Sequence, residues 1–160
     1  MGEEALPICE FDAGKLQGKL QLTLAAEVAR ISAAVAEVMA IVGQLECAAG
    51  HEFQIETALR EALANAIRHG SRNDPSKQVQ CCVACDPDRG MLLVVRDEGL
   101  GFDPSQLQSP VVGQNVFSDH GRGIFLINQL MDEVRFEKGG TEIHMLKRPA
   151  NGPTPEPKRP

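Results

Sequence analysis

Asp97, Gly99 and Gly101 follow an apolar segment and could together hold a flat ligand that donates hydrogen bonds. The segment, residues 91–95, contains only methionine, leucine and valine, which predicts a strand buried on both faces. A carboxylate at the end of such a strand is costly to desolvate unless a group donates to it, and the exocyclic amine of adenine is one such donor. The two glycines would let the backbone approach a flat ligand. An ordinary turn after a strand is the alternative interpretation.

Glu61 and Asn65 lie one helical turn apart within residues 52–69, whose apolar spacing predicts a helix that ends at Gly70. An asparagine oxygen suits Mg²⁺ that is otherwise held by phosphates and water. A glutamate one turn earlier can accept a proton from an attacking hydroxyl group or orient a water molecule. A solvated helix surface is the alternative for the same two residues.

The faces of this helix follow from a rotation of about 100° per residue. Its apolar side chains form one broad arc that should face the core: Ile55, Leu59, Ala62, Leu63, Ala66 and Ile67. Glu61, Asn65 and His69 form a stripe at the edge of that arc and should line a crevice, with a structural hydrogen bond expected of His69. Arg60, Ala64 and Arg68 are expected further round the helix.

Gly121 and Gly123 precede residues 124–131, which have a helical apolar pattern. Glycines just before a helix expose backbone N–H groups that, with the helix dipole, favour a phosphate chain. Residues 104–120 contain two prolines and no periodicity, which predicts a functional or mobile loop that we interpret as a lid. For Gly121 and Gly123, a plain connection between loop and helix is the alternative interpretation.

The remaining pattern predicts the elements that position these motifs. Alternation at 19–24 predicts a strand, with which residues 6–11 could pair, and strands at 78–85 and 90–96 form a hairpin. A second hairpin is expected at 133–137 and 141–147. Apolar residues between 25 and 50 predict a helix closed by Gly50; packing on its own sheet is favoured over a coiled-coil seam, which leaves a homodimer as the alternative.

Composition limits the classes of protein to which the chain can belong. Its 160 residues fit one domain, placed at 1–148, and five prolines in 149–160 predict a disordered tail. The net charge of −6 argues against nucleic acid or an anionic membrane as a partner. No apolar run is long enough to span a bilayer and the N-terminus is acidic, so a cytoplasmic location is expected.

The five cysteines, an odd number, also fit a reducing compartment. Cys82 and Cys85 are three residues apart, so on a strand they point to opposite faces and could not readily share a metal or a disulfide. Buried, unreactive thiols are therefore expected.

The motifs occur in one order, with Glu61 and Asn65 first, Asp97, Gly99 and Gly101 second, and Gly121 with Gly123 third. This combination is far more specific than any one motif, and it resembles the asparagine box and two glycine boxes of the GHKL ATPase superfamily. Residues 61–70, 121–127, 130–132 and 139–141 look most like bacterial anti-sigma-factor serine kinases within it. The resemblance covers residues 52–147.

The resemblance implies a Bergerat-type α/β two-layer sandwich, with a mixed, mainly antiparallel sheet backed by helices and ATP held between helix and lid. By the family's motif, Asp97 would receive the adenine amine, with Thr141 assisting at the base. Asn65 would coordinate Mg²⁺ and Glu61 would be the catalytic base. The residues implied to shape the pocket and lid are Gly99, Gly101, Gly121, Arg122 and Gly123.

The same resemblance implies an ATP-dependent serine/threonine kinase that is also an anti-sigma factor. Such kinases bind a sigma factor and phosphorylate a small anti-anti-sigma protein of the STAS type. Sensor histidine kinases usually carry a third glycine where this chain has Phe125. A module that binds ATP and a partner without phosphotransfer is one alternative, and a regulatory kinase of the same fold with other partners is another.

Overall fold

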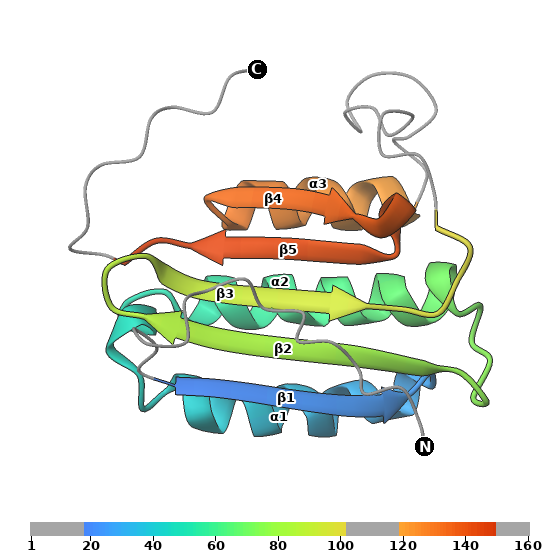
Figure 1. Ribbon diagram of the computed structural model, residues 1–160, viewed down its shortest axis with the longest axis horizontal. Helices are drawn as coiled ribbons and strands as arrows, with labels where there is room; N and C mark the ends of the chain where they lie inside the picture. Colours follow the sequence, from blue (N-terminus) through green and yellow to red (C-terminus); the bar gives the residue numbers. More distant parts are fainter. Residues whose placement is uncertain (1–17, 102–118, 150–160) are drawn as a thin grey trace.

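The computed structural model describes residues 18–101 and 119–149, which form one sheet with helices on one face (Figure 1). The strands lie in the order β1-β2-β3-β5-β4. Their bounds are β1 Gly18–Ala25, β2 Gln78–Asp86, β3 Gly90–Arg96, β4 Glu133–Glu137 and β5 Glu142–Lys147. The helices are α1 Ile31–Val42, α2 Glu52–Asn65 and α3 Asp119–Leu130, with α2 between the other two. This architecture confirms the predicted two-layer α/β class.

Every strand pairing in these ranges is antiparallel, whereas a mixed sheet was expected. β4 runs in the same direction as β3, but β5 lies between them, so no parallel pair forms. Both predicted hairpins and the strand predicted at 19–24 are confirmed, with no bound shifted by more than one residue. Residues 6–11 lie outside the described ranges.

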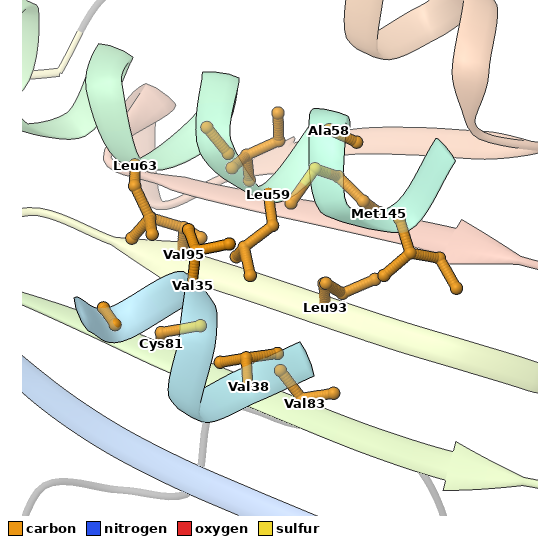
Figure 2. Close-up of a cluster of buried hydrophobic side chains, with 14 of the residues drawn as sticks. Val35, Val38, Ala58, Leu59, Leu63, Cys81, Val83, Leu93, Val95 and Met145 are labelled. Atoms are coloured by element: carbon orange, nitrogen blue, oxygen red, sulfur yellow. The ribbon is translucent and has the colours of Figure 1, made fainter. Parts of the chain in front are cut away.

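β3 is buried on both faces, as its uninterrupted apolar sequence predicts. Leu93 and Val95 pack into the main core between sheet and helices (Figure 2), and Met91 belongs to the same core. Leu92 and Val94 point to the other face of the sheet and pack with Leu146 in a smaller cluster. Both faces of this central strand are covered. Asp97, which directly follows the strand, therefore lies next to a region from which water is largely excluded.

α1 is shorter than the helix expected between residues 25 and 50. Before it, the Ala26 amide donates to Lys77 O (3.0 Å), Glu27 is extended, and the 3-10 turn Val28–Arg30 leads into the helix. It ends at Val42, and Gly50, with φ +84°, lies in the connection to α2. Five buried side chains of α1 pack in the chain's own core, as the favoured interpretation predicted: Ile31, Ala34, Val35, Val38 and Val42.

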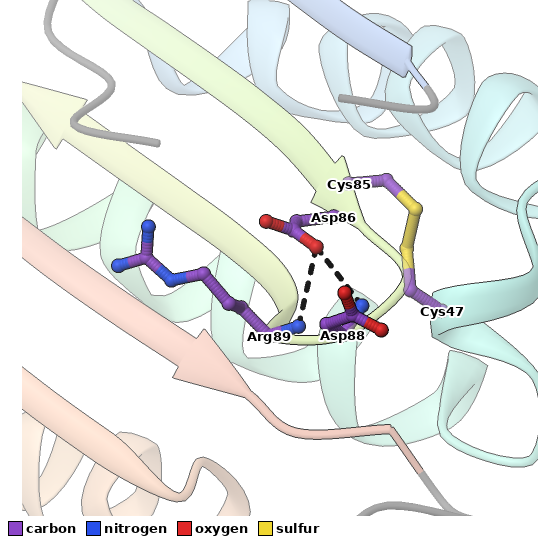
Figure 3. The surroundings of a disulfide bond; sticks show 5 residues. All are labelled: Cys47, Cys85, Asp86, Asp88 and Arg89. Atoms are coloured by element: carbon purple, nitrogen blue, oxygen red, sulfur yellow. Dashed lines mark hydrogen bonds between the residues drawn. A yellow bond between two sulfur atoms is a disulfide. The ribbon is translucent and has the colours of Figure 1, made fainter. Parts of the chain in front are cut away.

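A disulfide joins Cys47 to Cys85, with 6.1 Å between the Cα atoms (Figure 3). The expectation of buried, unreactive thiols was therefore wrong for Cys85, and Cys82 is disulfide-bonded as well. Cys82 and Cys85 do point to opposite faces, but Cys85 faces the helical layer, where the 3-10 turn Glu46–Ala48 brings Cys47. Cys81 is free and buried, and burial raises the pKa of its thiol to about 12. The inference of a reducing compartment therefore loses its basis.

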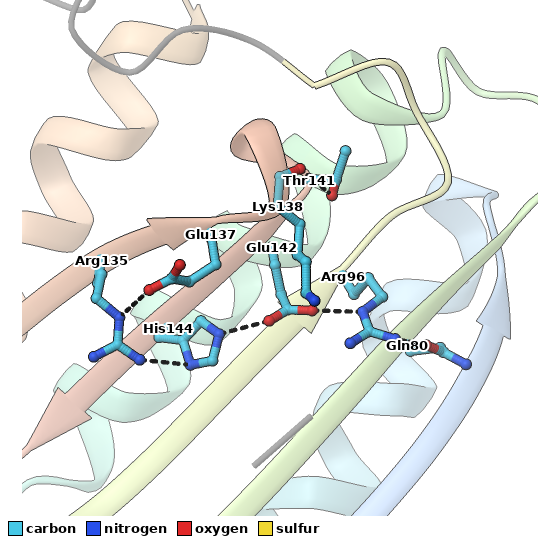
Figure 4. Close-up of polar contacts among 8 residues, drawn as sticks. All are labelled: Gln80, Arg96, Arg135, Glu137, Lys138, Thr141, Glu142 and His144. Atoms are coloured by element: carbon cyan, nitrogen blue, oxygen red, sulfur yellow. Dashed lines mark hydrogen bonds and ion pairs between the residues drawn. The ribbon is translucent and has the colours of Figure 1, made fainter. Parts of the chain in front are cut away.

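Charged side chains cross the outer face of the sheet, on the side away from the helices (Figure 4). Arg96 Nε donates to Glu142 Oε2 at 2.6 Å, and His144 Nε2 contacts Glu142 Oε1 at 2.7 Å. Arg135 Nη2 lies 3.5 Å from His144 Nδ1. Since an arginine can only donate, Nδ1 of His144 accepts and its Nε2–H donates to Glu142. The network links β3, β5 and β4 through side chains.

No helix in the described ranges is long and apolar enough to cross a membrane. The lid expected at 104–120 lies outside the described residues up to position 118. Of the tail expected at 149–160, only position 149 is described.

Candidate active site

A pocket of about 140 Å³ opens where β3 ends, between the C-terminal part of α2 and the β4–β5 hairpin. Its apolar wall is formed by Ala62, Ala66, Val95, Ile124, Phe136 and Ile143. The polar side chains that line it are Asn65, His69, Asp97 and Thr141. An apolar pocket with a few convergent polar groups is the usual form of a small-molecule site. We call this space the base pocket.

Asp97 follows β3 directly and is held at both its backbone and its side chain. Its amide donates to Thr141 O at 2.9 Å, and its Oδ1 accepts the Gly99 N–H at 2.7 Å. Burial raises the pKa of the Asp97 carboxyl, although the Gly99 N–H and Lys77 partly offset this effect. The carboxylate is therefore oriented and poorly solvated, which makes it a good acceptor for a donor in the pocket.

Two segments approach Asp97 too closely for any side chain. A Cβ atom at Gly70 would collide with the Asp97 carboxyl group, and one at Gly99 would collide with Gly70 O. Gly101 has φ +80°, and a Cβ there would meet Gly139 O. Gly101 lines the base pocket, whereas Gly99 shapes it through the Gly70 backbone. Gly70 was predicted only as a helix end, and its packing against Asp97 was missed.

Thr141 lies across the base pocket from α2, after the 3-10 turn Lys138–Gly140. Its Oγ1 donates to Lys138 O at 2.9 Å, so the hydroxyl hydrogen is already used within the turn. The hydroxyl oxygen retains the capacity to accept. Thr141 and Asp97 therefore face one pocket, as the family motif implied.

Glu61 and Asn65 line a second pocket, which we call the phosphate pocket for the chemistry predicted there. Its lining residues are Glu61, Ala64, Asn65, Arg68, His69, Arg122, Gly123 and Leu126. Asn65 and His69 line both pockets, so the two spaces adjoin at the C-terminal end of α2. Thus the structure brings the predicted base and metal ligand together, beside the space reached by Asp97.

Gly123 explains how α3 approaches this pair. A Cβ at Gly123 would lie 3.0 Å from both Glu61 Oε2 and Asn65 Nδ2. The expectation that Gly121 and Gly123 precede the helix was wrong, because α3 begins at Asp119 and contains both residues. Gly121 is buried and lines neither pocket, whereas Arg122 is exposed and lines the phosphate pocket.

The Asn65 side chain fits a ligand at this position. Its Nδ2 atom is buried and has no hydrogen-bond partner in the structure. A buried NH2 group without a partner is costly, and an acceptor such as a phosphate oxygen would remove that cost, whereas a metal would be held by the amide oxygen of the same side chain. No cluster of three His, Cys, Asp or Glu able to hold a metal was found among the described residues. A Mg²⁺ ion would therefore depend on Asn65, phosphate oxygens and water, which is the coordination that Mg²⁺ commonly has.

Two residues of the phosphate pocket were expected elsewhere. Ala64 and Arg68 were placed further round the helix with Arg60, but the structure has both in the pocket of Glu61. Arg68 follows Glu61 by seven residues, which is within about 20° of two helical turns, so this spacing was the signal available in the sequence. His69, by contrast, was expected to line a crevice with Glu61 and Asn65, and it is exposed and lines both pockets.

The fold and the two adjoining pockets, one with the Asp97 carboxylate and both lined by Asn65, are those of a nucleotide-binding domain. The chain matches the family model of the histidine kinase-like ATPase domain over residues 24–147. It therefore belongs to this family, and ATP is the nucleotide that such an ATPase domain binds. The resemblance to GHKL ATPases is confirmed.

Comparison with individual proteins identifies a more specific group of relatives within this family. The chain is 31% identical over 137 residues to the anti-sigma F factor of Geobacillus stearothermophilus, covering 82% of this chain and 93% of that protein. It is 30% identical over 118 residues to the anti-sigma F factor of Clostridium novyi, covering 69% and 80%. The anti-sigma F factor of Bacillus cytotoxicus is 29% identical over 141 residues, covering 85% and 96%. The chain is thus similar to anti-sigma F factors over most of their length.

Proposed function

We propose that the protein is an ATP-dependent serine/threonine kinase and anti-sigma factor, which phosphorylates a small anti-anti-sigma protein of the STAS type. The observation that carries the proposal is the pairing of Glu61 with Asn65 in one pocket that adjoins the Asp97 pocket. A base and a metal ligand beside a nucleotide site are the parts that phosphoryl transfer requires. The similarity to anti-sigma F factors supports the class of partner.

Each residue has a distinct part in the proposed reaction. Asp97 accepts the adenine amine, and the glycines around it bring the backbone against the base. Asn65 would hold Mg²⁺, which when bound would neutralise charge on the phosphates. Glu61 accepts the proton of the serine or threonine hydroxyl as that oxygen attacks the terminal phosphorus, and the bond to the bridging oxygen breaks to release ADP. Glu61 can do this without touching the base, because it lines only the phosphate pocket of the two.

Replacement of Glu61 tests the proposal. In Glu61→Ala we expect Mg²⁺-ATP affinity to stay within a few-fold and phosphotransfer to an anti-anti-sigma protein to fall by about 10² or more, the usual worth of a positioned base. The measurement is transfer of labelled phosphate to candidate anti-anti-sigma proteins, with calorimetry for nucleotide binding. Asn65→Ala should instead weaken Mg²⁺-dependent ATP binding and phosphotransfer together.

Glu56→Ala is the matched control, since Glu56 lies on the same helix and lines neither pocket. It should transfer phosphate at the wild-type rate. If the wild-type protein binds a partner in an ATP-dependent way but transfers no phosphate to any candidate, the kinase proposal fails and a non-catalytic binding module takes its place.

A further inference from the structure

The phosphate pocket carries an excess of positive charge in a chain that is acidic as a whole. Among the described residues that line it, Arg68 and Arg122 are accompanied by one carboxylate, Glu61, while the formal net charge of the chain is −6. A local positive potential inside a concave surface attracts anions. The sequence analysis gave Arg122 a part in shaping the pocket and lid, whereas Arg68, although it lies within residues 61–70, was given no role there.

The Arg68 side chain is exposed and has no polar partner among the described residues. It lies in the π-helical turn Ala66–Gly70, three residues after Asn65. Within the described part of the chain, its guanidinium forms no ion pair or hydrogen bond. Other arginines are paired with glutamates: Arg30, Arg96, Arg135 and Arg148. An unpaired guanidinium at a pocket rim keeps all five N–H donors available for an anionic ligand.

The position of Arg68 in the site determines which part of a bound nucleotide it can contact. Asp97 and Thr141 line the base pocket, and Arg68 does not. Arg68 lines the phosphate pocket together with Glu61 and Asn65, which act at the terminal phosphate in the proposed function. A guanidinium at that end meets the phosphate chain, and its planar fork suits two oxygens of one phosphate group.

We propose that Arg68 binds the terminal phosphate of ATP and thereby makes the site prefer ATP to ADP. The inference rests on the proposed function for the orientation of the nucleotide, since it takes the phosphate end from the roles of Glu61 and Asn65. It makes Arg68 a specificity residue, because ADP lacks the group that Arg68 contacts. A guanidinium at this phosphate also stabilises the charge that spreads over its oxygens during transfer.

Calorimetric titration with Mg²⁺-ATP and with Mg²⁺-ADP tests the proposal without any phosphotransfer assay. In Arg68→Ala we expect ATP affinity to fall by about tenfold or more, the worth of a charge-assisted hydrogen bond, with ADP affinity within about twofold of the wild type. Arg68→Lys keeps the charge but loses the planar fork of the guanidinium, so its ATP affinity should lie between those of the wild type and Arg68→Ala.

Arg60→Ala is the control. Arg60 is an exposed arginine of α2 that lines neither pocket, and its removal should leave both affinities unchanged. Equal loss of ATP and ADP affinity in Arg68→Ala, or no loss of either, would overturn the assignment of Arg68 to the terminal phosphate. A wild-type protein that binds ATP but transfers no phosphate would contradict the kinase proposal alone, since the comparison of ATP with ADP could still be made.

Discussion

The immediate surroundings of Asp97 make its carboxylate a good hydrogen-bond acceptor. The Gly99 N–H fixes Oδ1 at 2.7 Å, and the absence of a side chain at Gly70 lets the backbone lie against the carboxyl group. Burial raises the pKa of Asp97, which is the sign of a carboxylate that water solvates poorly. A donor that enters the base pocket therefore meets an acceptor that is already oriented.

This geometry predicts a preference for ATP over GTP. A carboxylate at Asp97 accepts from the adenine amine but would face the carbonyl oxygen of guanine, with no hydrogen between two acceptors. Asp97→Asn should weaken ATP binding by about 1.5 to 3 kcal/mol, the range for a hydrogen bond to a charged group. Calorimetry with both nucleotides measures this effect.

Asp88→Asn is a suitable control for Asp97→Asn, because Asp88 is exposed in the turn at the opposite end of β3. Equal affinity of the wild-type protein for ATP and GTP would contradict the role of Asp97 as the acceptor for the base.

α2 is the element that the two pockets share, and it is fixed at both ends. The Cys47–Cys85 disulfide ties the turn before α2 to the end of β2. After Asn65 the helix widens into a π-turn, where the Ser71 amide donates to Ala66 O at 2.8 Å. π-turns are often found at functional sites, and here the turn ends at Gly70 against Asp97. The helix thus carries Glu61 and Asn65 in a defined position relative to β3.

Loss of the disulfide should lower stability more than loss of a buried thiol alone. The bond closes a separation of 38 residues, for which chain entropy predicts about 4 kcal/mol of stabilisation. We expect the double variant Cys47→Ala with Cys85→Ala to lose about that much unfolding free energy in denaturant titrations under non-reducing conditions.

The free, buried Cys81 on the same strand gives the comparison. Cys81→Ala removes one buried thiol and no crosslink, so it should cost only about 1 kcal/mol. If the double variant unfolded at the same denaturant concentration as Cys81→Ala, the disulfide would contribute nothing measurable.

At the scale of the whole molecule, the two faces of the sheet are held by different forces. The helical face is an apolar core, whereas the outer face combines a small apolar cluster with the ionic network around Glu142. Burial raises the pKa of Glu142, but hydrogen bonds from His144 and Arg96 outweigh it and hold this pKa below its ordinary value. Ionised Glu142 therefore stabilises the folded sheet.

The direction of that shift fixes the sign of a pH effect. A carboxyl whose pKa is lower in the folded state contributes its stability above the unfolded value of 4.5, and that contribution is lost as the pH falls through the lower folded value. The unfolding free energy should therefore fall below about pH 4.5, and Glu142→Gln should flatten this acid limb. Thermal melts between neutral and acidic pH measure the difference.

Glu133→Gln is the corresponding control, because the Glu133 side chain is 58% exposed in its ion pair with Arg148. An exposed pair contributes little, so this variant should keep the wild-type acid limb. If Glu142→Gln and the wild type lost stability equally on acidification, protonation of Glu142 would not be the cause of the loss of stability at low pH.

Much of this protein could be predicted from local pattern alone. Residues 91–95 are all apolar, and the strand they form is covered on both faces. Glu61 and Asn65 recur at one helical turn within an apolar arc, and they line one pocket on α2. Such inferences succeed because side-chain direction in a helix or strand is set by the backbone repeat, which depends only on neighbours in the sequence.

Contacts between distant segments were decided by the tertiary structure. The partner of Cys85 is Cys47, 38 residues away, and no periodicity relates the two. α3 lies close to Glu61 and Asn65 because Gly123 leaves room there, although the pattern placed the helix start at position 124, after both glycines. Gly70 meets Asp97 only because the end of α2 and the end of β3 converge when helix packs on sheet. Packing brings such groups together across the chain, so their roles follow from where the layers meet rather than from their spacing along the sequence.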